Sequence, residues 1–296
     1  MTNICAKGIF NKKSCFDYDN LKAISLAYNK YMINHNKNNF ISNEMINSNN
    51  YDLLLEELKQ KLKCKDDLCI LNKSFLEKVH NKQIIYQRFK PEGPLNREWL
   101  SNWDIDNEML RFQNYYNCLL YTGTVSIDFN QKKMFNIYKN VFHHKSKYNR
   151  MPCFYFYTDK CTVKENNENK INCIATIYNT AKRSEQGEHW IATFVKMIDD
   201  STVKMYFFDS VGIKPPREIN NFFKYLEKKL FYKYKIEKKY NDVQHQYKNT
   251  ECGVYCINFI DNMASNSNSF DAYISQKKSD DDMQKNRQIY FRPIIS

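Results

Sequence analysis

Residues 250–260 have the sequence TECGVYCINFI, in which Cys252 and Gly253 directly precede apolar residues at helical spacing. This pattern predicts a helix that begins at or just after Cys252 and runs to about Met263. Cys252 would then lie at a helix N-terminus, where the helix dipole and unpaired N–H groups favour a nucleophilic thiolate. The alternative is a buried helix-start cysteine without chemistry, since free cysteines are usually buried.

A candidate base lies upstream, in residues 187–195 with the sequence GEHWIATFV. His189 comes just before one predicted strand, and Asp209 follows another, at residues 203–208. If the two strands are adjacent and antiparallel, Asp209 comes near His189, can accept the hydrogen bond from Nδ1–H and can stabilise the imidazolium. The alternative role for Asp209 is to start a turn, which Ser210 and Gly212 also favour.

An amide that could bind an oxyanion lies six positions before Cys252. Gln246 could complete an oxyanion hole with the backbone N–H of Cys252, although it could equally be an ordinary polar loop residue. Asn249, three residues before the cysteine, is a second candidate, and we prefer Gln246.

Composition favours a folded protein, because aromatic residues make up 15% of the 296 residues. No stretch approaches the roughly 18–20 apolar residues of a membrane span, and the start has no signal-peptide run, so we expect a soluble intracellular protein. The ten cysteines are scattered, and we expect most to be reduced.

The formal net charge of +12 could attract a polyanion such as DNA weakly, through basic runs such as residues 224–239. A solvated helix face is the alternative explanation for that run. Cys64, Cys69, His143 and His144 are potential zinc ligands, but no second well-spaced pair accompanies them. We therefore expect neither a metal nor a cofactor.

The chain divides at residues 88–94, RFKPEGP, where two prolines and a glycine end the helical pattern. Residues 1–90 are predicted to form a helical arm, with an Asn-rich connecting loop at residues 34–50. Residues 91–296 are predicted to form an α+β core. Its predicted helices lie at residues 104–118, from 216 to about 230 and from 252, and its predicted strands at residues 124–129, 153–157, 171–177, 190–197 and 203–208.

The order and spacing of these residues resemble the SUMO-protease and adenovirus-protease superfamily of cysteine peptidases. The matching residues are His189-Trp190, Phe208-Asp209-Ser210, Gln246 and Cys252-Gly253. Residues 103–109, WDIDNEM, resemble that superfamily's Trp-Leu-x-Asp helix opening. The resemblance implies that Trp103 and Trp190 form the walls of a narrow substrate tunnel, which only glycine can pass before the cut.

Within the superfamily, the polyprotein-processing proteases of large DNA viruses such as African swine fever virus are the more similar group. The likeness runs from about Cys64 to Arg292, whereas the first 60 residues show no match. The two types also differ in the residue that orients the histidine, which is Asp209 here and Asn in the swine fever type. The likeness implies a papain-like α+β core, with a mixed central sheet flanked by helices and preceded by a helical arm.

The same likeness implies an enzyme that cuts viral structural polyproteins after Gly-Gly during virion maturation, in the host cytoplasm (viral factory) and in the virion. An isopeptidase acting on SUMO or ubiquitin-like conjugates of the host and a binding relative that does not cleave are the alternatives. The oligomeric state is left open.

Overall fold

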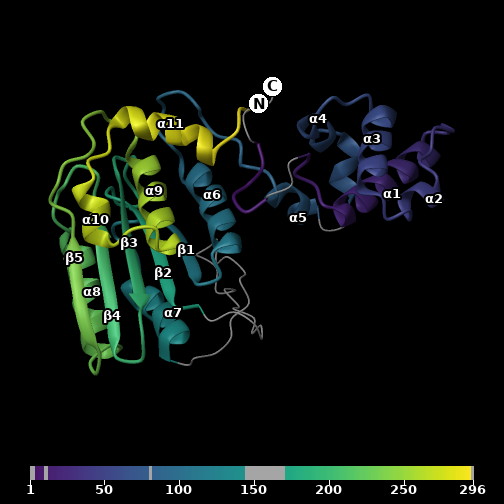
Figure 1. Ribbon diagram of the computed structural model, residues 1–296. Coiled ribbons are helices and arrows are strands. Elements are labelled where there is room, and N and C mark those ends of the chain that lie inside the picture. Colours follow the sequence, from purple (N-terminus) through teal and green to yellow (C-terminus); the bar gives the residue numbers. More distant parts are fainter. Residues whose placement is uncertain (1–3, 10–12, 80–81, 144–170, 295–296) are drawn as a thin grey trace. The chain divides into compact units, whose positions relative to one another are not determined.

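The computed structural model describes residues 4–9, 13–79, 82–143 and 171–294. The chain splits into two compact units, Met1–Lys90 and Pro91–Ser296, which are described separately below. Figure 1 shows the helices of the first unit and the sheet with its covering helices in the second.

The first unit is helical within its described residues, as predicted for the arm. Its elements are α1 (Tyr18–Asn34), α2 (Asn43–Ile46), α3 (Tyr51–Leu62), α4 (Asp67–Leu71), a 3-10 helix (Ser74–Lys78) and α5 (Lys82–Gln87). The helix starts are capped by side chains of Asp17, Ser42, Asn50 and Asp66. The loop predicted at residues 34–50 contains the short α2.

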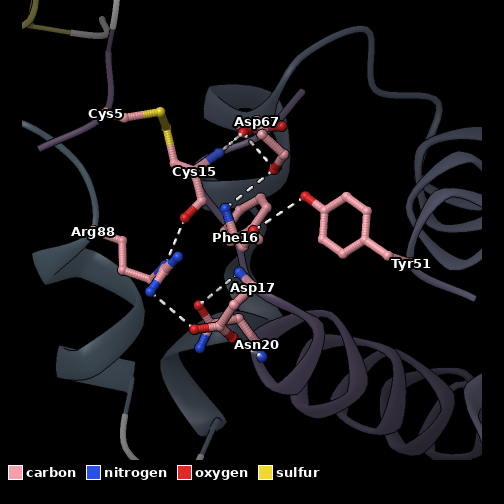
Figure 2. Close-up of a disulfide and its surroundings, with 9 residues drawn as sticks. Cys5, Cys15, Phe16, Asp17, Asn20, Tyr51, Asp67 and Arg88 are labelled. Carbon is pink, nitrogen blue, oxygen red and sulfur yellow. Dashed lines mark hydrogen bonds and ion pairs between the residues drawn. A yellow bond between two sulfur atoms is a disulfide. The ribbon is translucent and has the colours of Figure 1, made fainter. Parts of the chain in front are cut away.

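Two cysteine pairs in the arm are disulfide-bonded, Cys5 with Cys15 and Cys64 with Cys69. Figure 2 shows the first of them beside Asp67, which accepts hydrogen bonds from Ser14 Oγ and from the backbone N–H of Cys15, both at 2.7 Å. The expectation of mostly reduced cysteines is therefore wrong for the arm, where short sequence separations bring the paired residues together.

Arg88, near the end of the arm, binds to the same region. Its Nε donates to the Cys15 carbonyl at 2.6 Å and its Nη1 pairs with Asp17 at 2.9 Å (Figure 2). The start and the end of the unit are thus held together by the Arg88 guanidinium, while the disulfide joins two residues of the start.

Within the described residues of the second unit, five strands form one mixed sheet in the order β1-β2-β3-β4-β5. They are β1 (Leu119–Ser126), β2 (Cys173–Asn179), β3 (Trp190–Met197), β4 (Thr202–Phe208) and β5 (Lys235–Tyr240). The β2–β3 and β3–β4 pairs are antiparallel, and the outer pairs β1–β2 and β4–β5 are parallel.

Helices cover both faces of this sheet (Figure 1). One face packs against α6 (Asn102–Tyr115), α9 (Cys252–Ser265), α10 (Phe270–Ser275) and α11 (Asp280–Tyr290), and the other against α7 (Gln131–His143) and α8 (Arg217–Lys229). Successive residues of a strand alternate between the two cores, as Phe194 and Val195 do. The predicted α+β class with a mixed, helix-flanked sheet is confirmed.

Some predicted boundaries differ from the observed ones. Strand β3 and the start of α9 lie where the sequence placed them, but β1 begins five residues earlier than predicted, and its pairing with β2 shifts register between Tyr121 and Thr124. Edge strand β5 and helices α7, α10 and α11 were not predicted, β5 because its charged sequence KIEKKY has no apolar face. The strand predicted at 153–157 lies outside the described residues.

Replacing both Cys5 and Cys15 with serine is expected to lower the unfolding free energy of the arm by about 2 kcal/mol, because the disulfide closes a loop in the unfolded chain. All three tryptophans lie in the second unit. In urea, far-ultraviolet circular dichroism should therefore show earlier loss of the arm helices, while the tryptophan fluorescence transition stays in place. An unchanged dichroism curve, or an equal shift of both signals, would contradict this expectation.

Candidate active site

Cys252 is the first residue of α9, and 4% of its surface is exposed. Gly253 follows where a side chain has little room, because an added Cβ would lie 3.1 Å from Leu100 Cβ and 3.3 Å from Ile105 Cδ1. The glycine thus lets the start of α9 approach the segment that leads into α6. The sequence placed Cys252 at a helix N-terminus, and the structure agrees.

His189 and Asp209 meet because β3 and β4 are antiparallel neighbours. The pairing of Ala192 with Phe208 puts the residue before β3 and the residue after β4 at the same end of the sheet. His189 Nε2 lies 2.8 Å from Asp209 Oδ1, and the side chain of Cys252 interacts with the same imidazole and raises its pKa. The predicted meeting is correct, but the nitrogen that contacts the carboxylate is Nε2 and not Nδ1.

The correction has a simple geometric reason. The imidazole has one nitrogen on each side, and Asp209 occupies the side of Nε2. Nδ1 is therefore the nitrogen left to face the thiol. A ring that is bonded to a carboxylate through one nitrogen and has the other left for a thiol is the arrangement that a general base for a cysteine nucleophile requires.

Asp209 is buried and held at several points. Its Oδ1 also accepts the N–H of Val211 at 2.9 Å, and Asn241 brackets its backbone. Asn241 Oδ1 accepts the Asp209 N–H at 2.8 Å, while Asn241 Nδ2 donates to the Asp209 carbonyl at 2.6 Å. Sequence reasoning missed Asn241, because nothing at residues 240–244 marks it as different from a loop amide.

The electrostatics of the cluster favour a charged imidazole. Burial alone would lower the pKa of His189, but hydrogen bonds and charge from Asp209 and Cys252 outweigh burial and raise the pKa to about 10. At neutral pH the ring is then an imidazolium, the partner that a thiolate needs. One turn into α9, burial raises the pKa of Cys256 well above its ordinary value, so that sulfur stays a thiol.

Gln246 lies buried beside the loop that carries Asp209. Its Oε1 accepts a hydrogen bond from Ser210 Oγ at 2.6 Å, and its Nε2 donates to the carbonyl of Lys248. Asn249, the alternative, is exposed. The Nε2 amide group has two N–H donors and only one is used by the Lys248 carbonyl, so the second is the donor that an oxyanion would accept from.

The two predicted tunnel residues lie near the start of α9. The indole Nε1 of Trp190 donates to the carbonyl of Leu100 at 3.0 Å, and Leu100 lies against Gly253. Trp103 lies in the first turn of α6, three residues after Leu100, and is 59% exposed. Next to Trp190 and Asn102 is a pocket of about 360 Å³, whose walls include the ends of β1 and β2 and the loop before His189.

The remaining sequence candidates do not form a site in the part of the chain that the structure describes. Cys64 and Cys69 are bonded to each other, and the side chains of His143 and His144 lie outside the described residues. The described residues contain no group of three or more His, Cys, Asp or Glu side chains placed to hold a metal ion. Among the described helices, none is long and apolar enough to cross a membrane.

Comparison with known proteins finds viral proteases that are similar to this chain. A family model described as adenovirus endoprotease matches residues 154–281. A thiol protease of Acanthamoeba polyphaga mimivirus is 30% identical over 309 aligned positions, which cover 98% of this chain and 93% of that protein. A cysteine protease of African swine fever virus is 26% identical over 254 positions, covering 80% of this chain and 86% of the relative.

Among solved structures, the crystal structure of the African swine fever virus protease has the same fold, with a TM-score of 0.68 at 21% identity. The match covers 99% of this chain and 97% of that one. The likeness therefore includes the helical arm as well as the α+β core.

A helix-start thiol beside a histidine that is paired with a carboxylate, on an α+β core, defines the class as cysteine protease. The chain belongs to the superfamily of the adenovirus and SUMO proteases, since it is 30% identical to the mimivirus thiol protease along almost its whole length. The resemblance expected from the sequence motifs is confirmed.

The raised pKa of His189 predicts the direction in which the unfolding free energy changes with pH. Histidine in an unfolded chain titrates near 6.5, so the pairing with Asp209 contributes stability that is fully present below that pH and is lost as pH rises through about 10. Asp209→Asn removes the charge of the partner. The difference in unfolding free energy between wild type and variant is expected to be largest just below pH 6.5 and to shrink toward pH 10.

Urea unfolding followed by tryptophan fluorescence at a series of pH values measures this difference. Asp242→Asn, at an exposed position on the neighbouring loop, is the matched control and should show no such trend. A difference that grows with pH would show that the assigned charge state is wrong.

Proposed function

We propose that the protein is a cysteine endopeptidase that cuts polypeptide chains after a Gly-Gly pair. The observation that carries the proposal is the His189 ring, which hydrogen-bonds Asp209 at 2.8 Å and interacts electrostatically with the side chain of Cys252. The sulfur stands at the start of a buried helix, where N–H groups and the helix dipole favour an anion.

In the proposed reaction, the Cys252 thiolate attacks the carbonyl carbon after the second glycine. The backbone N–H of Cys252 and the amide of Gln246 bind the oxyanion. The His189 imidazolium then gives its proton to the leaving amine, and a thioester remains. His189 next takes a proton from water, the hydroxide attacks the thioester, and the free enzyme returns.

Glycine specificity is proposed to come from the two indoles. Trp190 is fixed by its hydrogen bond to Leu100, which lies against the residue after the nucleophile. With Trp103 on the adjacent first turn of α6, the two rings would leave a passage too narrow for a side chain. Residues upstream of the glycine pair would then enter the pocket beside Trp190.

We propose viral structural polyproteins as the substrates, cut during virion maturation in the viral factory of the host cytoplasm and in the virion. The support is the class of the relatives, a mimivirus thiol protease and an African swine fever virus cysteine protease that align along most of this chain. A weak polyanion contact through the basic residues of α8 and β5 is a further expectation. An isopeptidase acting on ubiquitin-like conjugates would share the same site and differ only in substrate.

Labelling with a peptide that ends in Gly-Gly and carries a thiol-reactive group tests the nucleophile and the glycine preference together. Mass spectrometry is expected to find the adduct on Cys252 in wild type. Cys252→Ala should abolish both the adduct and cleavage of Gly-Gly peptides while keeping the fold, and His189→Ala should slow labelling by about 10²-fold or more, because the base is lost.

Two controls make the labelling decisive. Cys118→Ala removes a partly exposed thiol elsewhere in the same unit and should leave the adduct unchanged. An Ala-Ala probe should label Cys252 far more slowly than Gly-Gly. Full cleavage by Cys252→Ala would end the proposal, whereas specific binding of Gly-Gly peptides without turnover would indicate the non-cleaving relative.

Gln246→Ala is expected to lower kcat by about 10²-fold with little change in KM, because the amide binds charge that develops only in the transition state. Asn249→Ala, three residues away and exposed, is the matched control and should keep kcat. If Asn249→Ala instead shows the loss, the oxyanion assignment passes to Asn249.

A further inference from the structure

Helix α9 has a start unlike those of the three helices that pack on the same face of the sheet, α6, α10 and α11. Ser101, Ser269 and Ser279 directly precede α6, α10 and α11, and each caps the first turn of its helix with the side-chain oxygen. At α9 the capping position is Glu251, whose side chain makes no capping hydrogen bond. A carboxylate at this position would ordinarily be attracted to the helix N–H groups.

The Glu251 carboxylate is turned to other partners. Its Oε2 accepts a hydrogen bond from Arg287 Nε at 2.8 Å, and its Oε1 accepts one from Thr250 Oγ1 at 3.1 Å. Both Glu251 and Arg287 have side chains with 0% of their surface exposed. This is a dry ion pair directly next to the proposed nucleophile.

Arg287 uses its remaining donors on main-chain carbonyls. Nη1 donates to Pro94 at 3.1 Å, and Nη2 donates to Thr250 at 2.9 Å and to Glu98. One guanidinium from α11 thus holds the residue two positions before Cys252 and the segment that leads to Leu100. A planar fork with several donors suits this task, and the single ammonium of a lysine does not.

We propose that Arg287 is a positioning residue for the nucleophile, acting by neutralising Glu251 and holding its carboxylate off the start of α9. The N–H groups of the first turn then remain free for the Cys252 thiolate and for the oxyanion of the reaction. The inference rests on the proposed function, because it takes Cys252 as the nucleophile.

Because Arg287 and Glu251 carry opposite charges, the proposal predicts that replacing one or the other shifts the ionisation of Cys252 in opposite directions. Besides Arg287 and Glu251, the titratable groups near the start of α9 include His189 before β3, Asp209 after β4 and the neutral Cys256, with Asp280 and Asp282 of α11 acting on Tyr255. Arg287→Met leaves the Glu251 charge uncompensated one residue from the sulfur and disfavours the thiolate. Glu251→Gln leaves the guanidinium uncompensated and favours it.

The two variants break the same ion pair, so a purely structural role predicts the same effect for both. The measurement is the rate at which iodoacetamide alkylates Cys252 as a function of pH, with the modified peptide identified by mass spectrometry. Relative to wild type, the midpoint is expected to move up by about one pH unit in Arg287→Met, a tenfold loss of thiolate at a given pH, and to move down in Glu251→Gln. Shifts in the same direction, or no shift, would overturn the proposal.

Removing one partner of a buried ion pair can unfold a protein, so a third variant replaces both. Arg287→Met combined with Glu251→Met keeps the volume and removes both charges, and its midpoint is expected to return close to that of wild type. A midpoint in the double variant as high as in Arg287→Met would show that the lost carbonyl contacts, and not the charge, are responsible, and would contradict the proposal.

Arg292→Met is the matched control. Arg292 lies five residues farther along, is buried and pairs with Glu92 at 2.7 Å and not with Glu251, so its loss should leave the midpoint unchanged. Alkylation needs no substrate, so it tests Arg287 even if Gly-Gly peptides are not cut. Conversely, failure of the charge prediction alongside normal Gly-Gly cleavage would leave the proposed function intact.

Discussion

The burial of helix α9 is the constraint on which the catalytic unit depends. From Val254 to Ile260 every residue is buried, so the helix needs apolar neighbours on all sides. The sheet supplies one side through residues such as Phe194 and Phe208, and α6, α10 and α11 supply the others. Because the start of this helix is fixed by so much packing, Cys252 has little freedom to move away from His189.

Two pairs of opposite charges surround the thiol, and each is held by the backbone of a different element. His189 and Asp209 meet because β3 and β4 pair in antiparallel register. Glu251 and Arg287 meet because α11 packs beside α9. A buried charge is costly unless it is paired and hydrogen-bonded, so the fold must keep both pairs together to avoid destabilising the core.

Several parts of the site could be predicted from short-range signals. A cysteine before an apolar helix, a histidine before an apolar strand and a carboxylate after the next strand each mark the edge of an element, and their order matched a known superfamily. The atom that contacts Asp209, the role of Asn241 and the clamp formed by Arg287 could not be predicted. Each of these depends on side chains that are remote in sequence, such as residues 251 and 287, coming within hydrogen-bonding distance.

The sequence by itself determined the α+β class, the start of α9 and the residue types of the cluster, because helical and strand periodicity are local properties of the chain. The tertiary structure decided which ring nitrogen faces Asp209, which cysteines of the arm are bonded and which cation pairs with Glu251. Those outcomes depend on the packing of elements far apart in the chain, and pairwise distances of that kind are set only when the whole core closes.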